Sequence, residues 1–261
     1  MTTVYLPFTG ELGSSLLRWI PTVLAAPEPK IICHAPGDEA LFPNVARHLV
    51  PRPSAELSGG AGSKDDAERW QTIKATLGPD MTYVEPAALD LATPLPPTRP
   101  TGSSLNLSPD VVLLPRDKWY AANRNWSNWN VIASRLKAAG LDLFVAGLPE
   151  TTFDLGTPAA WDYDRPLDAT LAALAGARLV VGPPTGTALL ALMVGALLWV
   201  VCTADGRCAP NGLSVPHGYF VLADLDGIGY RLAPYWDAPE RLAEEIVRAI
   251  PETCFHEASD A

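Results

Sequence analysis

Cysteine and histidine are scarce in this chain, and neither residue type has a metal-binding spacing. The one close cysteine pair is six residues apart and lacks the second pair that a zinc site needs. The four histidines include no pair spaced to share one face of a helix. We therefore expect the protein to hold no metal or other cofactor, and we expect buried thiols at Cys33, Cys202, Cys208 and Cys254.

Basic residues are outnumbered, and long apolar runs are missing. Lys and Arg number 19 against 29 Asp and Glu, a formal net charge of -10, which disfavours broad attachment to nucleic acid or to an anionic membrane surface. No uninterrupted run of about 18 apolar residues occurs, so stable membrane insertion is not expected. The first four residues also lack the charged and apolar regions of a signal peptide. We expect a cytoplasmic protein.

Strand-like and helix-like segments alternate along the chain, which is typical of an α/β fold with parallel sheets. The composition, with 48% hydrophobic and 18% charged residues, is that of a compact globule. The apolar patterns predict strands at 3–7, 30–34, 82–84, 111–114, 141–146, 178–181 and 197–202. They predict helices at 14–25, 39–49, 65–77, 127–139, 167–174, 187–194 and 239–250.

A proline-rich stretch divides the chain. Pro94, Pro96, Pro97 and Pro100 constrain the backbone where periodic apolar residues are absent. We predict an N-terminal domain at 1–95, a linker at 96–109 and a C-terminal domain at 110–261. Each would be a separate α/β unit.

The segment 111–147 reads as strand, basic loop, helix and strand. Its loop carries Arg116, Lys118 and Arg124 where an open parallel sheet presents its strand ends and helix N-termini to a ligand. Guanidinium groups suit bidentate phosphate contacts, so the loop indicates an anionic ligand, a diphosphate. The alternative is a solvated basic surface. Trp126 and Trp129 lie close by, either as core residues or as a wall that stacks a base.

A second candidate for phosphate binding follows the strand at 178–181. The sequence Gly-Pro-Pro-Thr-Gly-Thr joins this strand to a helix, so backbone amides near Thr185, Gly186 and Thr187 can face an anion. The alternative is a helix start that is merely capped.

A carboxylate marks the loop after the first strand. Glu11 precedes the first predicted helix, where it can act as a general base on an attacking hydroxyl. The alternative is a cap or a partner of the helix dipole.

Taken in order, these motifs resemble those of GT-B glycosyltransferases, in the heptosyltransferase-like branch (glycosyltransferase family 9-like). The resemblance lies in Gly10-Glu11-Leu12-Gly13 with Trp19 and Pro21, in Arg124-Asn125-Trp126, and in the turn from Gly182 to Gly186 with Ala191. It implies two Rossmann-like domains facing across a cleft, the N-terminal one small and on the acceptor side. The C-terminal domain would bind the sugar nucleotide.

The resemblance also implies roles for individual residues. Glu11 would be the catalytic base, and the reaction would need no protein-bound metal because cations and helix dipoles stabilise the leaving diphosphate. Arg116, Lys118, Arg124 and the Thr185–Thr187 turn would hold that diphosphate. Gly147 and Glu150, which follow the second strand of the C-terminal domain, would contact the nucleoside.

The chain departs from the family pattern at three places. Pro184 stands where heptosyltransferases commonly have an acidic residue, Leu189 stands where they have a histidine, and the register of their first-loop aspartate falls on Ser15.

We therefore predict a hexosyl- or heptosyltransferase that moves a sugar from a nucleoside-diphosphate sugar to an acceptor hydroxyl. A glycan is the acceptor we expect first, and a modified nucleic-acid base is the other candidate. The alternative function is a non-catalytic protein of the same fold that binds nucleotide sugars. A dinucleotide-dependent oxidoreductase is disfavoured because the first strand is not followed by Gly-x-Gly-x-x-Gly.

Overall fold

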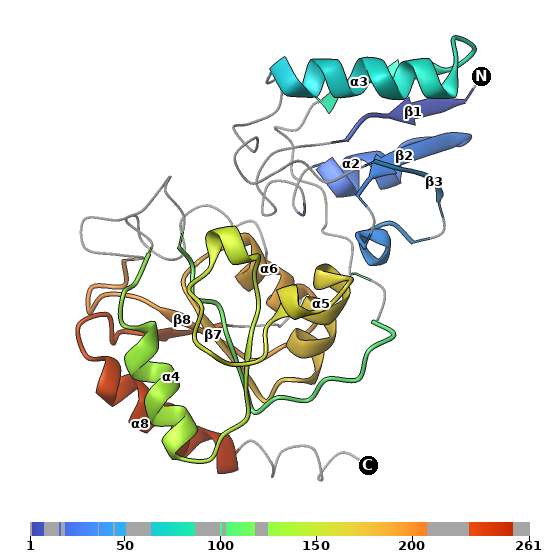
Figure 1. The fold of residues 1–261 in the computed structure, drawn as a ribbon. Coiled ribbons are helices and arrows are strands. Elements are labelled where there is room, and N and C mark those ends of the chain that lie inside the picture. Colours follow the sequence, from blue (N-terminus) through green and yellow to red (C-terminus); the bar gives the residue numbers. More distant parts are fainter. Residues whose placement is uncertain are drawn as a thin grey trace. The chain divides into compact units, whose positions relative to one another are not determined.

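The chain forms two compact units, Met1–Gly102 and Ser103–Ala261 (Figure 1). This computed structural model describes residues 2–7, 16, 19–35, 37–43, 45–50, 64–86, 100, 103–117, 125–207 and 230–252. Each unit contains one sheet, and every strand pair in both sheets is parallel. The α/β class expected from the sequence is confirmed. Among the described residues, no helix combines the length and apolarity needed to cross a membrane.

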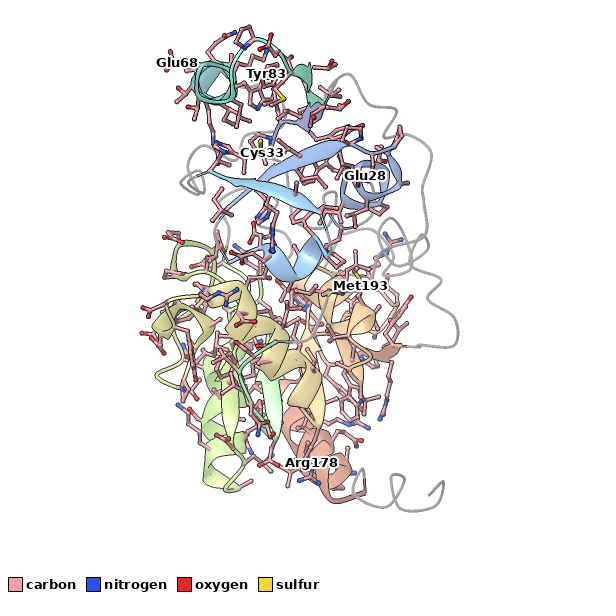
Figure 2. All side chains as sticks on the ribbon, turned by 90° about the vertical axis from the view of Figure 1, so that its right-hand side faces the viewer. Glu28, Cys33, Glu68, Tyr83, Arg178 and Met193 are labelled. Carbon is pink, nitrogen blue, oxygen red and sulfur yellow. The ribbon has the colours of Figure 1, made fainter. Side chains whose placement is uncertain are left out.

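The sheet of the first unit has the order β3-β2-β1-β4. Its strands are β1 (Thr3–Tyr5), β2 (Lys30–His34), β3 (Ala46–Leu49) and β4 (Thr82–Val84), and its helices are α2 (Ile20–Ala25), η2 (Glu39–Leu41) and α3 (Lys64–Leu77). Val4, Leu6 and Cys33 pack against Trp70 and Ile73 of α3. Cys33 is labelled on β2 in Figure 2. Alternate strand residues therefore fill the layer between the sheet and α3.

The helix predicted over 39–49 is wrong. Residues Glu39–Leu41 form a single 3-10 turn, and Ala46–Leu49 form strand β3, in register with Ile31 to His34 of β2. Pro43 explains the break, because a proline disfavours helical geometry at the residue before it. Phe42 accordingly has φ -129° and ψ 66°, outside the helical region.

The sheet of the second unit has the order β6-β5-β7-β8-β9. Its strands are β5 (Val111–Leu113), β6 (Leu143–Val145), β7 (Leu179–Gly182), β8 (Leu198–Val201) and β9 (Tyr230–Ala233). Counted from its own first strand, this is the 2-1-3-4-5 order of doubly wound nucleotide-binding sheets. Strand β9 was not predicted, since it is an edge strand whose Arg231 and Leu232 are exposed. The Arg231 guanidinium lies 4.3 Å from the centre of the Trp199 ring.

Helices cover both faces of this sheet. They are α4 (Trp129–Ala138), η6 (Pro149–Thr151), η7 (Ala160–Asp162), α5 (Pro166–Gly176), α6 (Gly186–Met193) and α8 (Pro239–Glu252). Helices α4 and α8 lie side by side (Figure 1), and their apolar residues share one core with Leu113, Val181 and Val201 of the strands. Helices α5 and α6 also contact each other.

Arg178 fixes the amino edge of the sheet, away from the expected ligand site. Its Nη1 donates to Asp110 Oδ1 at 3.0 Å, and its Nη2 donates to the carbonyl of Ile250 in α8. Asp110 Oδ2 also accepts from the amide of Asp142, at 2.9 Å. The starts of β5 and β7 and the end of α8 are thus joined by one guanidinium, which Figure 2 labels.

Candidate functional site

Strands β5 and β7 mark the point where the order of the second sheet reverses. They pair directly, with Val111 opposite Leu179, while β6 lies outside β5 and β8 lies outside β7. In doubly wound sheets, ligands bind beside the carboxyl ends of the strands at such a switch point. The segments at this point are residues 114–117 after β5 and 183–187 after β7. Both segments contain residues that the sequence predicts for diphosphate binding.

The ends of β5 and β7 are packed tightly together. The Leu114 amide donates to the carbonyl of Val181 at 2.9 Å. A Cβ on Gly182 would lie 2.5 Å from Leu114 Cβ, closer than such atoms pack. Glycine at 182 is therefore required for the two strand ends to approach each other.

The turn after β7 presents polar groups to solvent between two buried segments. Pro183 and Pro184 are buried, whereas Thr185, Gly186 and Thr187 are partly exposed. Thr185 caps α6, because its Oγ1 accepts from the Ala188 amide at 3.2 Å. The alternative expected from the sequence, a capped helix start, is thus present.

Capping leaves hydrogen-bond donors available at the same helix end. In the part of the chain that the structure describes, the amides of Gly186 and Thr187 have no acceptor, as is usual for the first turn of a helix. The Thr185 hydroxyl accepts through its lone pair and keeps its proton for donation. Two amides and one hydroxyl, at the positive end of the helix dipole, form a set of donors suited to an anion.

Arg116 lies at the same edge of the sheet, but its side chain is buried within the protein. The residue is 5% exposed, and its Nη1 donates to Asn125 Oδ1 at 2.7 Å. The amide of Asp117 donates to the Thr151 carbonyl at 2.8 Å, which holds the loop backbone against the segment after β6. A direct contact between Arg116 and a diphosphate stays a prediction.

Three of the other predicted site residues lie outside the described residues, namely Glu11, Lys118 and Arg124. Gly147 follows β6, and a side chain there would overlap Thr152 Oγ1. Glu150 is exposed in η6. Thr152 also pairs with Arg116, so the segment predicted to contact the nucleoside lies against the loop after β5. Its role stays a prediction.

The aromatic residues beside the basic loop are core residues. Trp126 and Trp129 are 2% and 1% exposed. Their rings meet edge to face with centres 5.0 Å apart, and Trp126 Nε1 donates to the Trp236 carbonyl at 2.8 Å. Of the two roles left open for these tryptophans, packing is the one that the structure supports.

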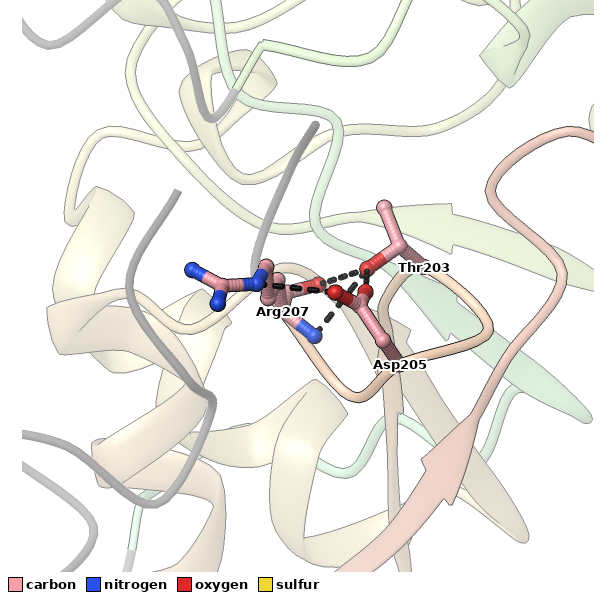
Figure 3. Close-up of polar contacts among 3 residues, drawn as sticks. All are labelled: Thr203, Asp205 and Arg207. Carbon is pink, nitrogen blue, oxygen red and sulfur yellow. Dashed lines mark hydrogen bonds and ion pairs between the residues drawn. The ribbon is translucent and has the colours of Figure 1, made fainter. Parts of the chain in front are cut away.

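A loop missed by the sequence analysis follows β8 at the same carboxyl edge (Figure 3). Thr203 Oγ1 donates to Asp205 Oδ1 at 2.5 Å, and Arg207 Nε donates to Asp205 Oδ2 at 2.8 Å. The Thr203 bond and then the Arg207 bond hold the pKa of the Asp205 carboxyl below its usual value. The Asp-Gly dipeptide after an apolar strand was the available signal for this turn. These bonds are internal to the loop and stabilise its shape.

The first unit has a corresponding switch point between β1 and β4, where the Leu6 amide donates to the Val84 carbonyl at 3.0 Å. At the end of the neighbouring β2, His34 is 3% exposed and stacks on Phe42, with ring centres 4.7 Å apart. Its Nδ1 lies 2.8 Å from the Ala35 carbonyl, and its Nε2 has no hydrogen-bond partner among the residues that the structure describes. Burial raises the pKa of the adjacent Cys33 thiol to about 12, so this cysteine is not a nucleophile near neutral pH.

No group of three or more His, Cys, Asp or Glu side chains suited to holding a metal occurs among the described residues. No family model matches the sequence, and a comparison with curated proteins finds no match.

Solved structures give the informative comparison. The chain superposes on Escherichia coli ADP-heptose lipopolysaccharide heptosyltransferase II with a TM-score of 0.53 and 13% identity, covering 98% of this chain and 99% of that one. It also superposes on TibC of enterotoxigenic E. coli H10407, an iron-containing dodecameric glycosyltransferase, with a TM-score of 0.50 and 11% identity. That alignment covers 97% of this chain and 76% of TibC.

The chain has a heptosyltransferase-like fold. The resemblance expected from the glycine-containing loop after β1 and from the turn after β7 is thereby confirmed at the level of the fold. Sequence identities of 11% and 13% carry over no residue role. The roles of individual side chains therefore have to be argued from their positions and contacts in this chain.

Proposed function

We propose that this chain is a glycosyltransferase, which moves a sugar from a nucleoside-diphosphate sugar to an acceptor hydroxyl. The observation that carries the proposal is the pair of amides at Gly186 and Thr187, which have no acceptor among the described residues and lie beside the switch point of a doubly wound sheet. A diphosphate is anionic, and its oxygens can accept a hydrogen bond from each of the two amides. The heptosyltransferase-like fold supports the same function class.

In the proposed reaction, the diphosphate of the donor binds at the Thr185–Thr187 turn. The bond between the anomeric carbon and the diphosphate oxygen breaks, and negative charge grows on the leaving group. The N-terminus of α6, Lys118 and Arg124 stabilise this charge, and the nearby cation of Arg116 adds to the positive potential. No step requires a protein-bound metal.

The acceptor hydroxyl attacks the anomeric carbon and loses its proton to Glu11, which acts as general base. This assigns the acceptor to the N-terminal domain, the donor to the C-terminal domain, and the nucleoside to the segment with Gly147 and Glu150. It also requires the two domains to face each other across a cleft.

ADP-heptose is the first donor to test, since the E. coli heptosyltransferase II is named for it. A glycan is the first acceptor to test, and the cytoplasmic location stays part of the proposal.

A non-catalytic binding protein of the same fold is the second candidate. Pro184 is buried and has no amide proton, and Leu189 is 0% exposed within the core. These positions therefore offer no polar side chain to a diphosphate. Diphosphate binding would then depend on the Thr185–Thr187 turn and on the loop cations alone. This smaller set of contacts favours a protein that binds the nucleotide sugar without efficient turnover.

A thermal-shift screen followed by a transfer assay distinguishes these functions. The screen uses ADP, GDP, UDP, CDP and dTDP with their sugar conjugates, and the proposal expects one nucleotide to raise the melting temperature. Consumption of its sugar conjugate with a glycan acceptor supports transfer, whereas a shift without consumption supports the binding protein. A flat response to all of these compounds contradicts both functions.

Glu11→Gln tests the assignment of the base. We expect nucleotide binding within about twofold of the wild type and transfer lowered by about a hundredfold or more, the usual scale of positioned acid-base catalysis. The matched control is Glu68→Gln, because Glu68 is an exposed carboxylate on α3 of the same unit. Equal turnover in Glu11→Gln and wild type removes Glu11 from the mechanism.

A further inference from the structure

The loop after β8 leaves the sheet beside the proposed diphosphate site. Strand β8 pairs with β7, with Gly182 opposite Val200. The loop at 203–207 and the Thr185–Thr187 turn therefore leave neighbouring strands, about 4.8 Å apart, at the same carboxyl edge. The segment proposed for the nucleoside follows β6, on the far side of β5 and β7. A donor extended along this edge, with its nucleoside beside β6 and its diphosphate beside β7, has its sugar beside β8.

Hydrogen bonds fix the backbone of this loop. The Thr203 amide donates to the Arg207 carbonyl at 2.9 Å, and the Gly206 amide donates to the Thr203 carbonyl at 2.9 Å. Gly206 has φ 73°, which favours glycine. At the base of the loop, the Trp236 amide donates to the Cys202 carbonyl at 3.0 Å. Because the loop is ordered in advance, a ligand that contacts it incurs little loss of conformational entropy.

The same loop holds the Asp205 carboxylate in one orientation (Figure 3). Its Oδ1 accepts from Thr203 Oγ1 at 2.5 Å, and its Oδ2 accepts from Arg207 Nε at 2.8 Å. The Asp205 side chain is nevertheless 63% exposed. A carboxylate has about four lone-pair sites, so these two bonds leave it able to accept from a ligand.

Arg207 makes this carboxylate compatible with a diphosphate nearby. An unpaired carboxylate would repel the diphosphate, whereas the Asp205–Arg207 ion pair has no net charge. The bonds from Thr203 and Arg207 lower the pKa of the Asp205 carboxyl, so the group is ionised at neutral pH. An ionised carboxylate is a strong acceptor for hydroxyl groups, which a sugar ring carries in number.

We infer that the loop at 203–207 binds the sugar of the donor, with the Asp205 carboxylate accepting hydrogen bonds from its hydroxyls. Arg207 is a positioning residue, because it orients this carboxylate and neutralises its charge. The inference rests on the proposed function, since it assumes that a nucleoside-diphosphate sugar binds at this edge of the sheet. It gives a role to a loop that lies outside the sites predicted from the sequence.

The double variant Asp205→Ala/Arg207→Met tests the inference, because it leaves the net charge of the loop unchanged. The probes for calorimetry are the nucleoside diphosphate that gives the largest wild-type thermal shift and the sugar conjugate of it that binds most tightly. We expect affinity for the conjugate to fall about tenfold or more, the scale of hydrogen bonds to a charged group. Affinity for the diphosphate alone should stay within about twofold, which also shows that the variant is folded.

The single variant Arg207→Met tests the positioning role. It leaves the Asp205 carboxylate without this partner, so the diphosphate alone should bind about threefold more weakly. Adding Asp205→Ala should restore diphosphate affinity, because the repelling charge is then removed. A loss that persists in the double variant makes Arg207 a phosphate ligand and overturns its positioning role.

Two further variants separate the carboxylate from general effects. Glu245→Ala/Arg248→Met removes an ion pair of the same kind from α8, with a separation of 3.0 Å, and should leave both affinities unchanged. Thr203→Val removes one bond of the loop but keeps Asp205 and Arg207, so its loss of conjugate affinity should be smaller than that of the double variant.

Wild-type affinity for the conjugate in Asp205→Ala/Arg207→Met overturns the inference. Equal losses for the conjugate and the diphosphate also overturn it, because the loop then contacts the phosphates or supports the site only structurally. If the wild type binds no nucleoside diphosphate, the proposed function fails as well. If it binds the diphosphate and the variants leave the conjugate unaffected, only the inference fails, so the two failures are distinguishable.

Discussion

Replacing Thr185 by aspartate separates the stability of α6 from anion binding at its N-terminus. Thr185 Oγ1 accepts from the Ala188 amide at 3.2 Å, and an aspartate carboxylate is an equally good N-cap. Its negative charge also interacts favourably with the helix dipole, by about 0.3–1 kcal/mol. Thr185→Asp should therefore leave the melting temperature unchanged or slightly raised.

The same charge opposes a diphosphate at the Gly186 and Thr187 amides. Two unit charges about 5 Å apart at an effective dielectric constant of about 20 repel each other by about 3 kcal/mol. Solvent screening reduces this value, but a diphosphate carries more than one negative charge. We expect affinity for a nucleoside diphosphate to fall by about a hundredfold or more, which corresponds to about 2.7 kcal/mol.

The assay pairs thermal melting with calorimetry on three substitutions of Thr185. Thr185→Ser keeps the hydroxyl and should resemble the wild type in both measurements. Thr185→Asn keeps a neutral cap and should lose less affinity than Thr185→Asp. Undiminished diphosphate binding by Thr185→Asp would refute the reasoning, because the anion would then bind away from this helix end.

Three further predictions concern stability and reactivity. Gly182→Ala should lower the free energy of unfolding by about 1–3 kcal/mol in urea titrations, because its Cβ would overlap the Leu114 side chain. The double variant with Leu114→Gly should lose less stability than the two single variants add up to, and strict additivity would contradict this contact. Thr203→Val should raise the pKa of Asp205. A depressed carboxyl pKa stabilises the fold at pH values above the unfolded pKa of 3.8. The melting temperature of Thr203→Val should therefore lie furthest below that of the wild type at neutral pH, and this difference should shrink as the pH falls through the folded pKa. In a variant with Cys33 as sole cysteine, this thiol should react with a thiol reagent at about pH 8 only after unfolding, and rapid native reaction contradicts its burial.

Strands whose apolar runs end at clear turn signals were predictable. Strand β2 and the edge strand β4 have the expected bounds, 30–34 and 82–84. The edge strands β3 and β9 were not predictable in this way. Strand β3 was taken for the end of a helix, and β9 was missed, because exposed side chains such as Arg47 and Arg231 remove the apolar pattern that burial imposes. Pairing with a neighbouring strand, and not local propensity, determines their structure.

The candidate site divides in a similar way. The Thr185–Thr187 turn could be predicted, since a strand, a glycine-containing turn and a helix are contiguous in the sequence. The Arg116–Asn125 bond could not, because it joins side chains nine residues apart through backbone positions set by the segment after β6. Nor did sequence distinguish a core role for Trp126 from a base-stacking role, because an aromatic residue near a basic loop fits both.

The central claim is that a diphosphate binds at the N-terminus of α6, and a crystal structure of the protein with its preferred nucleoside diphosphate tests this most directly. The account predicts phosphate oxygens within hydrogen-bonding distance, about 2.7–3.2 Å, of the amide nitrogens of Gly186 and Thr187. A well-ordered diphosphate bound elsewhere, with these two amides contacting only water, would contradict it.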